Sequence, residues 1–205
     1  MAAGEPERRS MDSESLRRAQ RIVDLAWRDL PPNHRLLLQN VRADSWEVTD
    51  RPLGLRADEL LQSAGQTQLT RSQRAALDRA LGVWIDSLRV ILIDAGHQEL
   101  RGLNDQAYEA ALVRVAWHEW AHALSIARST SDDVAAGARL LELAPQGVRV
   151  GIRSAGYRRN EYTHELVAET YALLMARRRR GQTGQPAWLD AEIYTLVRRV
   201  CGWAQ

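Results

Sequence analysis

Apolar residues recur in the first part of the chain with the spacing of an amphipathic helix. From Ser15 onward they return every three or four positions, until Pro31 and Pro32 end the pattern. A second apolar cluster at residues 36–38 predicts a short helix, and the stretch Trp46–Thr49 predicts a short strand. The first fifty residues therefore predict two helices followed by a strand.

The middle of the chain predicts a loop, a helix and a strand in that order. Residues 50–69 are rich in loop formers, with one helical turn expected at 58–62, and residues 71–81 follow as a helix. The β-branched run Arg89–Asp94 gives the strongest strand signal in the chain. This strand is expected either at the edge of a substrate cleft or as an ordinary interior strand.

The remaining residues are mainly helical in pattern. A helix capped at Asn104 or Asp105 runs to about Ala127, and a second opens at 130–131 and ends before Pro145. The glycine-containing stretch 148–159 predicts a loop or a short strand pair. Asn160 is expected to cap a long helix to about Arg180. Pro186 is expected in the first turn of a last helix that ends near Val200.

Together these elements predict an α+β fold, mainly helical with a small β-sheet. Residues 1–14 are charged, have little to bury and are expected to form a disordered tail. Residues 15–205 are expected to form a single domain. Within it, residues 15–82 make an N-terminal helical part and residues 83–205 make the core that carries the chemistry.

Composition narrows the classes of partner and compartment. Of the 205 residues 45% are hydrophobic and 26% charged, and no apolar run approaches the ~18 residues needed to span a membrane. The polar N-terminus lacks the apolar centre of a secretory signal, so a cytoplasmic location is expected. All 28 basic residues are arginine, which together with abundant Ala, Gly and Leu indicates a GC-rich bacterial genome. Because the net charge is only +2 and both signs are spread along the chain, nucleic acid is an unfavoured partner.

The sequence His118-Glu119-Trp120-Ala121-His122 is the motif that carries chemistry. Residues four apart lie on one face of a helix, so the two histidines can bind one metal ion. Glu119 lies about 100° around the axis, from which it can act as general base on a zinc-bound water. The alternative is a pair of core histidines on a buried helix. The motif favours one Zn²⁺ per chain.

A catalytic zinc site needs a third protein ligand and one open position. The helix after Asn160 offers four candidates downstream of the motif. They are Glu161, His164, Glu165 and Glu169. Glu165 and Glu169 share a face with two alanines, and acidic residues on such a closely packed face need a partner. We therefore expect Glu165 to bind zinc and Glu169 to accept a hydrogen bond from a ligand histidine. His164 is retained as an alternative third ligand.

These residues resemble a known group of enzymes. HExxH followed by Glu-x-x-x-Glu on a second helix is similar to the gluzincins. The segment ELVAETY at 165–171 resembles the ExxAExF/Y segment of the lethal-factor-like metallopeptidases, which include the secreted Pro-Pro endopeptidases. The resemblance covers roughly residues 88–176. It implies a zincin-like metallopeptidase domain in which Glu165 binds zinc and Tyr157 donates a hydrogen bond to the oxyanion, with Tyr162 as the rival donor.

The motif and the resemblance together predict a zinc metallopeptidase that acts on a peptide or protein substrate. Two other functions use the same residues: hydrolysis of a non-peptide amide or ester, and a regulatory or binding domain with structural zinc. The sequence does not predict the oligomeric state.

Three further features receive structural interpretations. The run Arg177–Arg180 is expected to be solvated at a helix C-terminus, where cations complement the helix dipole, with a phosphate or nucleic-acid contact as the alternative. His34 is expected in a turn, and His97 in a surface turn with a position lining the cleft as the alternative.

Overall fold

Three strands form one small sheet, and helices supply most of the remaining structure. The computed structural model describes residues 10–155 and 157–203. The strands are β1 (Trp46–Thr49), β2 (Gly82–Ile85) and β3 (Val90–Asp94), in the spatial order β1-β3-β2. β1 runs parallel to β3 and β2 runs antiparallel to it. The predicted class, α+β and mainly helical with a small sheet, is confirmed.

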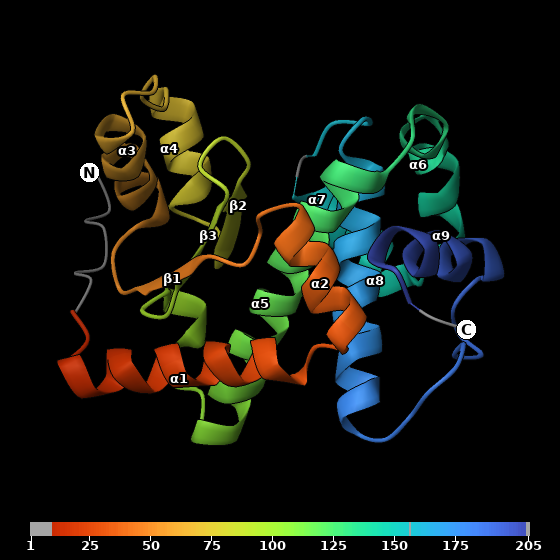
Figure 1. Ribbon diagram of the computed structural model, residues 1–205, viewed down its shortest axis with the longest axis horizontal. Coiled ribbons are helices and arrows are strands. Elements are labelled where there is room, and N and C mark those ends of the chain that lie inside the picture. Colours follow the sequence, from red (N-terminus) through yellow and green to blue (C-terminus); the bar gives the residue numbers. More distant parts are fainter. Residues whose placement is uncertain (1–9, 156, 204–205) are drawn as a thin grey trace, which may run out of the picture.

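Two long central helices separate the sheet from the C-terminal helices (Figure 1). The helices are α1 (Ser13–Asp29), α2 (Pro32–Asn40), α3 (Leu53–Ser63), α4 (Arg71–Leu77), η1 (Gln98–Leu100), α5 (Asp105–Arg128), α6 (Ser131–Leu143), α7 (Gln146–Ser154), α8 (Tyr162–Arg179) and α9 (Ala191–Cys201). α5 and α8 pack against each other, α3 and α4 lie beside the sheet, and α6 and α9 pack against the other side of α8. No helix of the described ranges is long and apolar enough to cross a membrane.

The first helix forms as its apolar pattern predicts. The Asp12 carboxylate accepts a hydrogen bond from the Ser15 N–H and caps α1, which buries one apolar stripe against the core. Its buried residues are Ala19, Ile22, Val23 and Ala26. The expected disordered tail, residues 1–14, overlaps this helix, because Ser13 and Glu14 are already helical. Residues 1–9 of that tail lie outside the described residues.

Three elements differ from the prediction in type. The stretch 50–69 was expected to be a loop with one helical turn at 58–62, but it contains the 11-residue helix α3, which buries Leu53, Ala57 and Leu61. The stretch 148–159 was expected to lack a helix, but Gln146–Ser154 is helical and buries Ile152 against α8. Gly156 of that stretch lies outside the described residues. The short strand β2 precedes β3 in a hairpin, and no glycine marks the turn between them. Instead Arg89 adopts φ 53° and its guanidinium contacts Asp86 at 2.7 Å.

The two C-terminal helices begin later than predicted. Asn160 does not cap α8, whose N-cap position is Glu161 and has no side-chain cap. Pro186 lies before α9, and Asp190 caps that helix by accepting the Glu192 N–H. These shifts move helix boundaries but leave Glu119, Glu169 and the predicted metal ligands on α5 and α8, with Tyr157 in the segment between α7 and α8.

Candidate metal centre

Tryptophan packing fixes how α5 presents its motif. Trp117 and Trp120 are buried, and the Trp117 indole N–H donates to the Ala26 carbonyl at 3.1 Å. The Trp120 ring packs against Trp27 in a tilted arrangement and against Trp46 edge-to-face, at centroid distances of 5.2 and 5.5 Å. These contacts hold α5 against α1 and β1. Because Trp117 and Trp120 point into the core, His118 and Glu119 point away from it, toward other elements.

His118 and His122 meet Glu165 where α5 and α8 pack together. Their ring Nε2 atoms are 2.9 Å apart. The Glu165 carboxylate lies 3.3 Å from His122 Nε2 and 3.7 Å from His118 Nε2. On α8 the fully buried Ala168 and Ala172 allow close approach to α5. The structure therefore brings together the two histidines and the glutamate that were predicted as ligands.

The donor atoms fit a zinc ion in number, chemistry and spacing. One atom from each of the three residues lies within 4.8 Å of the others, and no further His, Cys, Asp or Glu of the described chain joins them. Zinc with bonds of about 2.0–2.1 Å in a tetrahedron places its ligand atoms about 3.3 Å apart. The two ring nitrogens are 2.9 Å apart, and they lie 3.3 and 3.7 Å from different oxygens of the Glu165 carboxylate. Two imidazoles and one carboxylate also form a ligand set that zinc uses in catalytic sites.

A second carboxylate, that of Glu169, lies beside His118. Glu169 Oε1 lies 3.6 Å from His118 Nδ1, on the ring edge opposite the ligand nitrogen. Its other oxygen accepts a 2.7 Å hydrogen bond from the Arg114 guanidinium. The 3.6 Å separation is longer than a hydrogen bond, so Glu169 acts on the His118 ring as a nearby negative charge. Glu169 therefore lies beside His118, but the expected hydrogen bond from the histidine is not formed at this separation. The Arg114 contact was not predicted.

Burial and neighbouring charges perturb the pKa values of both histidines. Burial, together with the nearby His122, lowers the pKa of His118 to about 3. Burial also opposes charging of His122, but its contact with the Glu165 carboxylate outweighs this and raises its pKa. A neutral His118 is the form that can bind a metal ion.

Glu119 faces the sheet instead of α8. Its carboxylate is buried and accepts a hydrogen bond from the backbone N–H of Trp84 on β2. Burial raises the pKa of Glu119 to about 7, against the opposing influence of His122. A carboxylate with a pKa near neutrality can both take up and release a proton at physiological pH.

A glycine on β2 provides the room for Glu119. A Cβ at Gly82 would lie 2.8 Å from Glu119 Cγ and 2.7 Å from Val115 Cγ1, both shorter than normal contacts. Neither Gly82 nor Trp84 was predicted as a site residue. Glycine at the start of a strand is the available signal, because it often marks the close approach of another group.

Tyr157 lines the same cavity as the motif, and Tyr162 does not. The cavity, of about 680 Å³, is lined by α4, β2, α5, the end of α7, Tyr157 and Glu165. Burial and the nearby Glu165 and Glu119 carboxylates raise the pKa of the Tyr157 hydroxyl. Tyr162 packs against the hydrophobic core. Of the two candidate donors, the geometry therefore favours Tyr157.

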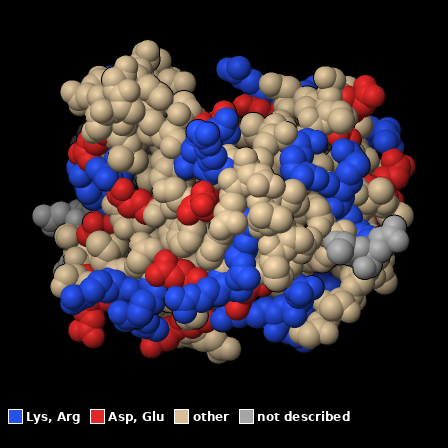
Figure 2. Space-filling model, viewed as in Figure 1, with Lys and Arg blue, Asp and Glu red and all other residues tan. Residues whose placement is uncertain are grey.

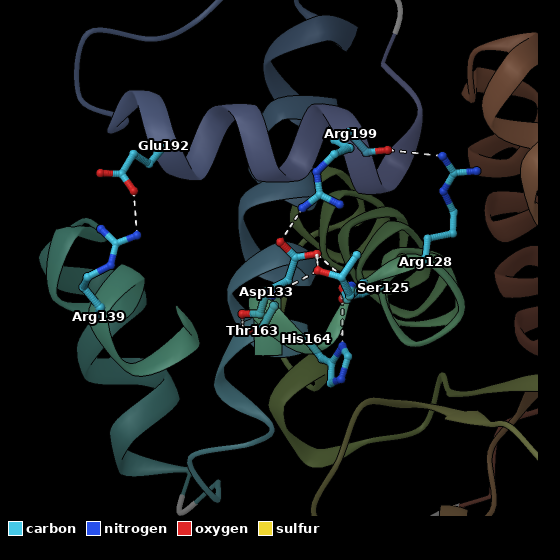
Figure 3. Close-up of polar contacts among 10 residues, drawn as sticks. Ser125, Arg128, Asp133, Arg139, Thr163, His164, Glu192 and Arg199 are labelled. Carbon is cyan, nitrogen blue, oxygen red and sulfur yellow. Dashed lines mark hydrogen bonds and ion pairs between the residues drawn. The ribbon is translucent and has the colours of Figure 1, made fainter. Parts of the chain in front are cut away.

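The alternative third ligands have other partners. His164 Nδ1 lies 2.8 Å from the Ser125 hydroxyl, beside the network in which Asp133 contacts Arg199 (Figure 3). Glu161 accepts a 2.6 Å hydrogen bond from the Arg158 N–H. Neither residue belongs to the group that could hold a metal ion.

The edge strand beside the cavity is β2. The stretch Arg89–Asp94 was expected either at the edge of a cleft or as an interior strand. It forms β3, which pairs with β1 on one side and β2 on the other, so the interior position is correct. The Asp94 N–H donates to the Leu81 carbonyl, so by alternation the backbone groups of Gly82 and Trp84 point away from β3. No strand of the described ranges pairs with this outer edge of β2.

The other histidines are buried, contrary to prediction. His34 lies within α2 and is fully buried, with its Nδ1 2.8 Å from the Tyr171 hydroxyl. His97 is 4% exposed and caps η1 by accepting the Glu99 N–H. Both were expected in turns from the neighbouring Pro and Gly residues, but tertiary packing covers them.

The arginine run lies at the C-terminus of α8, as predicted. Arg178, Arg179 and Arg180 are exposed, and Arg179 contacts Glu109 at 2.9 Å. On the face shown in Figure 2, basic and acidic side chains are interspersed over most of the surface.

Comparison with known proteins adds no assignment. No protein-family model, no curated protein and no solved structure matches the chain.

Proposed function

We propose that this protein is a zinc-dependent hydrolase of peptide bonds. One observation carries the proposal: the donor atoms of His118, His122 and Glu165 lie within 4.8 Å of one another in a cavity that also contains Glu119. The local resemblance of HEWAH and ELVAETY to lethal-factor-like metallopeptidases supports the same reaction class.

The residues of the cavity have separate roles in this reaction. A zinc ion bound there supplies a Lewis acid that lowers the pKa of a water molecule and polarises the substrate carbonyl. Glu119 takes a proton from the attacking water and returns it to the amine that leaves, which suits its pKa of about 7. Tyr157 donates its O–H to the negative charge that develops on the carbonyl oxygen.

The shape of the cavity favours an extended peptide as substrate. The outer edge of β2 carries the backbone N–H of Gly82 and the carbonyls of Gly82 and Trp84 beside the cavity, and such an edge can pair with an extended chain. The Trp84 N–H is already held by Glu119. A structural zinc site would need a fourth protein ligand, and none is present among the described residues. These observations favour a peptidase over the other two candidate functions.

Cleavage of a synthetic peptide library by the zinc-loaded protein, followed by mass spectrometry, tests the proposal. We expect cleavage by the wild type and a loss of about 10²–10⁴-fold in Glu119→Gln, with zinc content unchanged. Glu161→Gln is the matched control, because Glu161 is an acidic residue outside the metal group, and it should cleave like the wild type. Undiminished cleavage by Glu119→Gln would refute the role of Glu119. If the zinc-loaded wild type cleaves small amides or esters but no peptide, the protein is instead a hydrolase of non-peptide substrates.

A further inference from the structure

A second groove of about 700 Å³ lies on the opposite side of Glu169 from the metal centre. Its floor is one face of α8, on which Glu169, Leu173, Arg177 and Arg180 follow one another at helical spacing. Its walls are the start of α7, residue Arg114 of α5 and the side chain of Trp188. The volume is in the range of small-molecule sites in proteins.

The charges of this groove are unbalanced. Three arginines line it against one carboxylate, and that carboxylate, Glu169, already accepts a hydrogen bond from Arg114. Arg177 and Arg180 have no acidic partner among residues 10–155 and 157–203. The Nε atom of Arg177 is itself buried without a hydrogen-bond partner among the described residues, so any contact with a ligand in the groove falls to the other guanidinium nitrogens.

The rest of the lining is apolar. Trp188 is 44% exposed, and Val148 and Leu173 are only half-buried. Exposed indole beside unpaired guanidinium groups suits a ligand with an aromatic or apolar body and an anionic end. The first turn of α7 also opens onto the groove without a side-chain cap, so its partial positive charge adds to that of the arginines.

From this arrangement we propose that the groove binds a small organic anion, a carboxylate or phosphate carried on an apolar or aromatic body. Arg177 and Arg180 hold the anionic group through charge-assisted hydrogen bonds, and Trp188 covers the body. This groove borders the metal cavity, because Arg114 and Glu169 line it and Glu169 also lies beside His118. Its lining contains none of the three proposed metal ligands, so anion binding does not require the metal.

Isothermal titration of the full-length chain tests the proposal with three probes: 4-phenylbutyrate, phenyl phosphate and the neutral 4-phenylbutanol. We expect at least one of the two anions to bind, with one molecule per chain and about tenfold or more tightly than the alcohol. The anion that binds more tightly identifies the preferred head group. Arg177→Gln and Arg180→Gln should each weaken that binding by about tenfold. Glu165→Ala should leave it unchanged, which separates the groove from the metal cavity.

Arg178→Gln is the matched control, because Arg178 belongs to the same run but lines a different hollow with Tyr194 and Trp203. It should bind the anion like the wild type. The proposal is overturned if the alcohol binds as well as the anions, if neither anion binds at millimolar concentration, or if Arg178→Gln loses as much affinity as the other two variants. Melting temperatures establish that each variant is folded, and the exposed Arg180 provides a test even where Arg177→Gln does not fold.

Discussion

Replacing Gly82 by alanine is a direct test of how β2 and α5 fit together. The added Cβ would lie 2.7 Å from Val115 Cγ1, 2.8 Å from Glu119 Cγ and 3.0 Å from Glu119 Oε1. Carbon atoms in a packed interior are ordinarily about 3.5–4.0 Å apart, so one of these groups must move by about 1 Å. Gly82 does not have a positive φ, so the expected effect arises from steric contact alone.

Two measurable losses follow from that displacement. Overpacking of a buried contact typically costs ~1–3 kcal/mol, so the free energy of unfolding of Gly82→Ala should fall by about that amount. A displacement of about 1 Å at a general base can lower a rate by about 10²-fold, so kcat/KM for a cleaved peptide should fall while zinc content is retained. Urea unfolding measures the free energy of unfolding, steady-state kinetics measures kcat/KM, and elemental analysis measures the zinc content.

Gly147→Ala provides the matched control for this substitution. A Cβ at Gly147 meets nothing within 4 Å, and alanine is a better helix former than glycine in α7. This variant should be at least as stable as the wild type. If Gly82→Ala were also as stable and as active as the wild type, the close fit of Glu119 against β2 would be wrong.

Two further predictions concern Tyr157 and the buried His34. Tyr157→Phe should lower peptide cleavage by about 10²–10³-fold with zinc retained, since a hydrogen-bond donor to the developing oxyanion is lost, whereas Tyr162→Phe should not. If the wild type and Tyr157→Phe cleave the peptide at equal rates in steady-state assays, Tyr157 does not donate a hydrogen bond to the oxyanion. Burial, and next the charge of Arg178, lowers the pKa of His34 from 6.5 to about 4, so the folded state favours the neutral ring. The stability that this provides is complete above pH 6.5 and is lost as the pH falls toward 4, by about 2 kcal/mol at pH 5. Urea unfolding at pH 7.5 and pH 5 should show that extra loss in the wild type but not in His34→Gln; parallel losses in both proteins would contradict the assignment.

The sequence predicts the parts of the site that depend on local spacing. His118 and His122 share a face of α5 because they are four residues apart, and Glu119 faces β2 because it lies about 100° further round the axis. The preference for Glu165 over His164 came from the face it shares with Ala168, and packing of α8 against α5 follows that pattern.

The residues that the sequence did not reveal depend on contacts between distant segments. Arg114 reaches Glu169 across 55 positions of sequence, and Trp84 approaches Glu119 only because β2 packs against α5. No local pattern encodes either contact. Their positions follow from tertiary packing, which single-sequence periodicity does not report.

The misassigned elements have the same cause. The segment that forms α7 contains Gly147 and Gly151, which lower its helix propensity, but burial of Ile152 against α8 stabilises the helix. β2 is four residues long and begins with glycine, so its pairing with β3 stabilises a strand that its own sequence barely indicates.

The zinc content of the purified protein tests the central claim most directly. Elemental analysis should find about one zinc per chain in the wild type, and Glu165→Ala should lose it because a three-ligand site is reduced to two. His164→Ala is the matched control, because His164 contacts Ser125 and lies outside the metal group, and it should retain the metal. Absence of zinc from the wild type after incubation with the metal, or unchanged zinc in Glu165→Ala, would contradict the account.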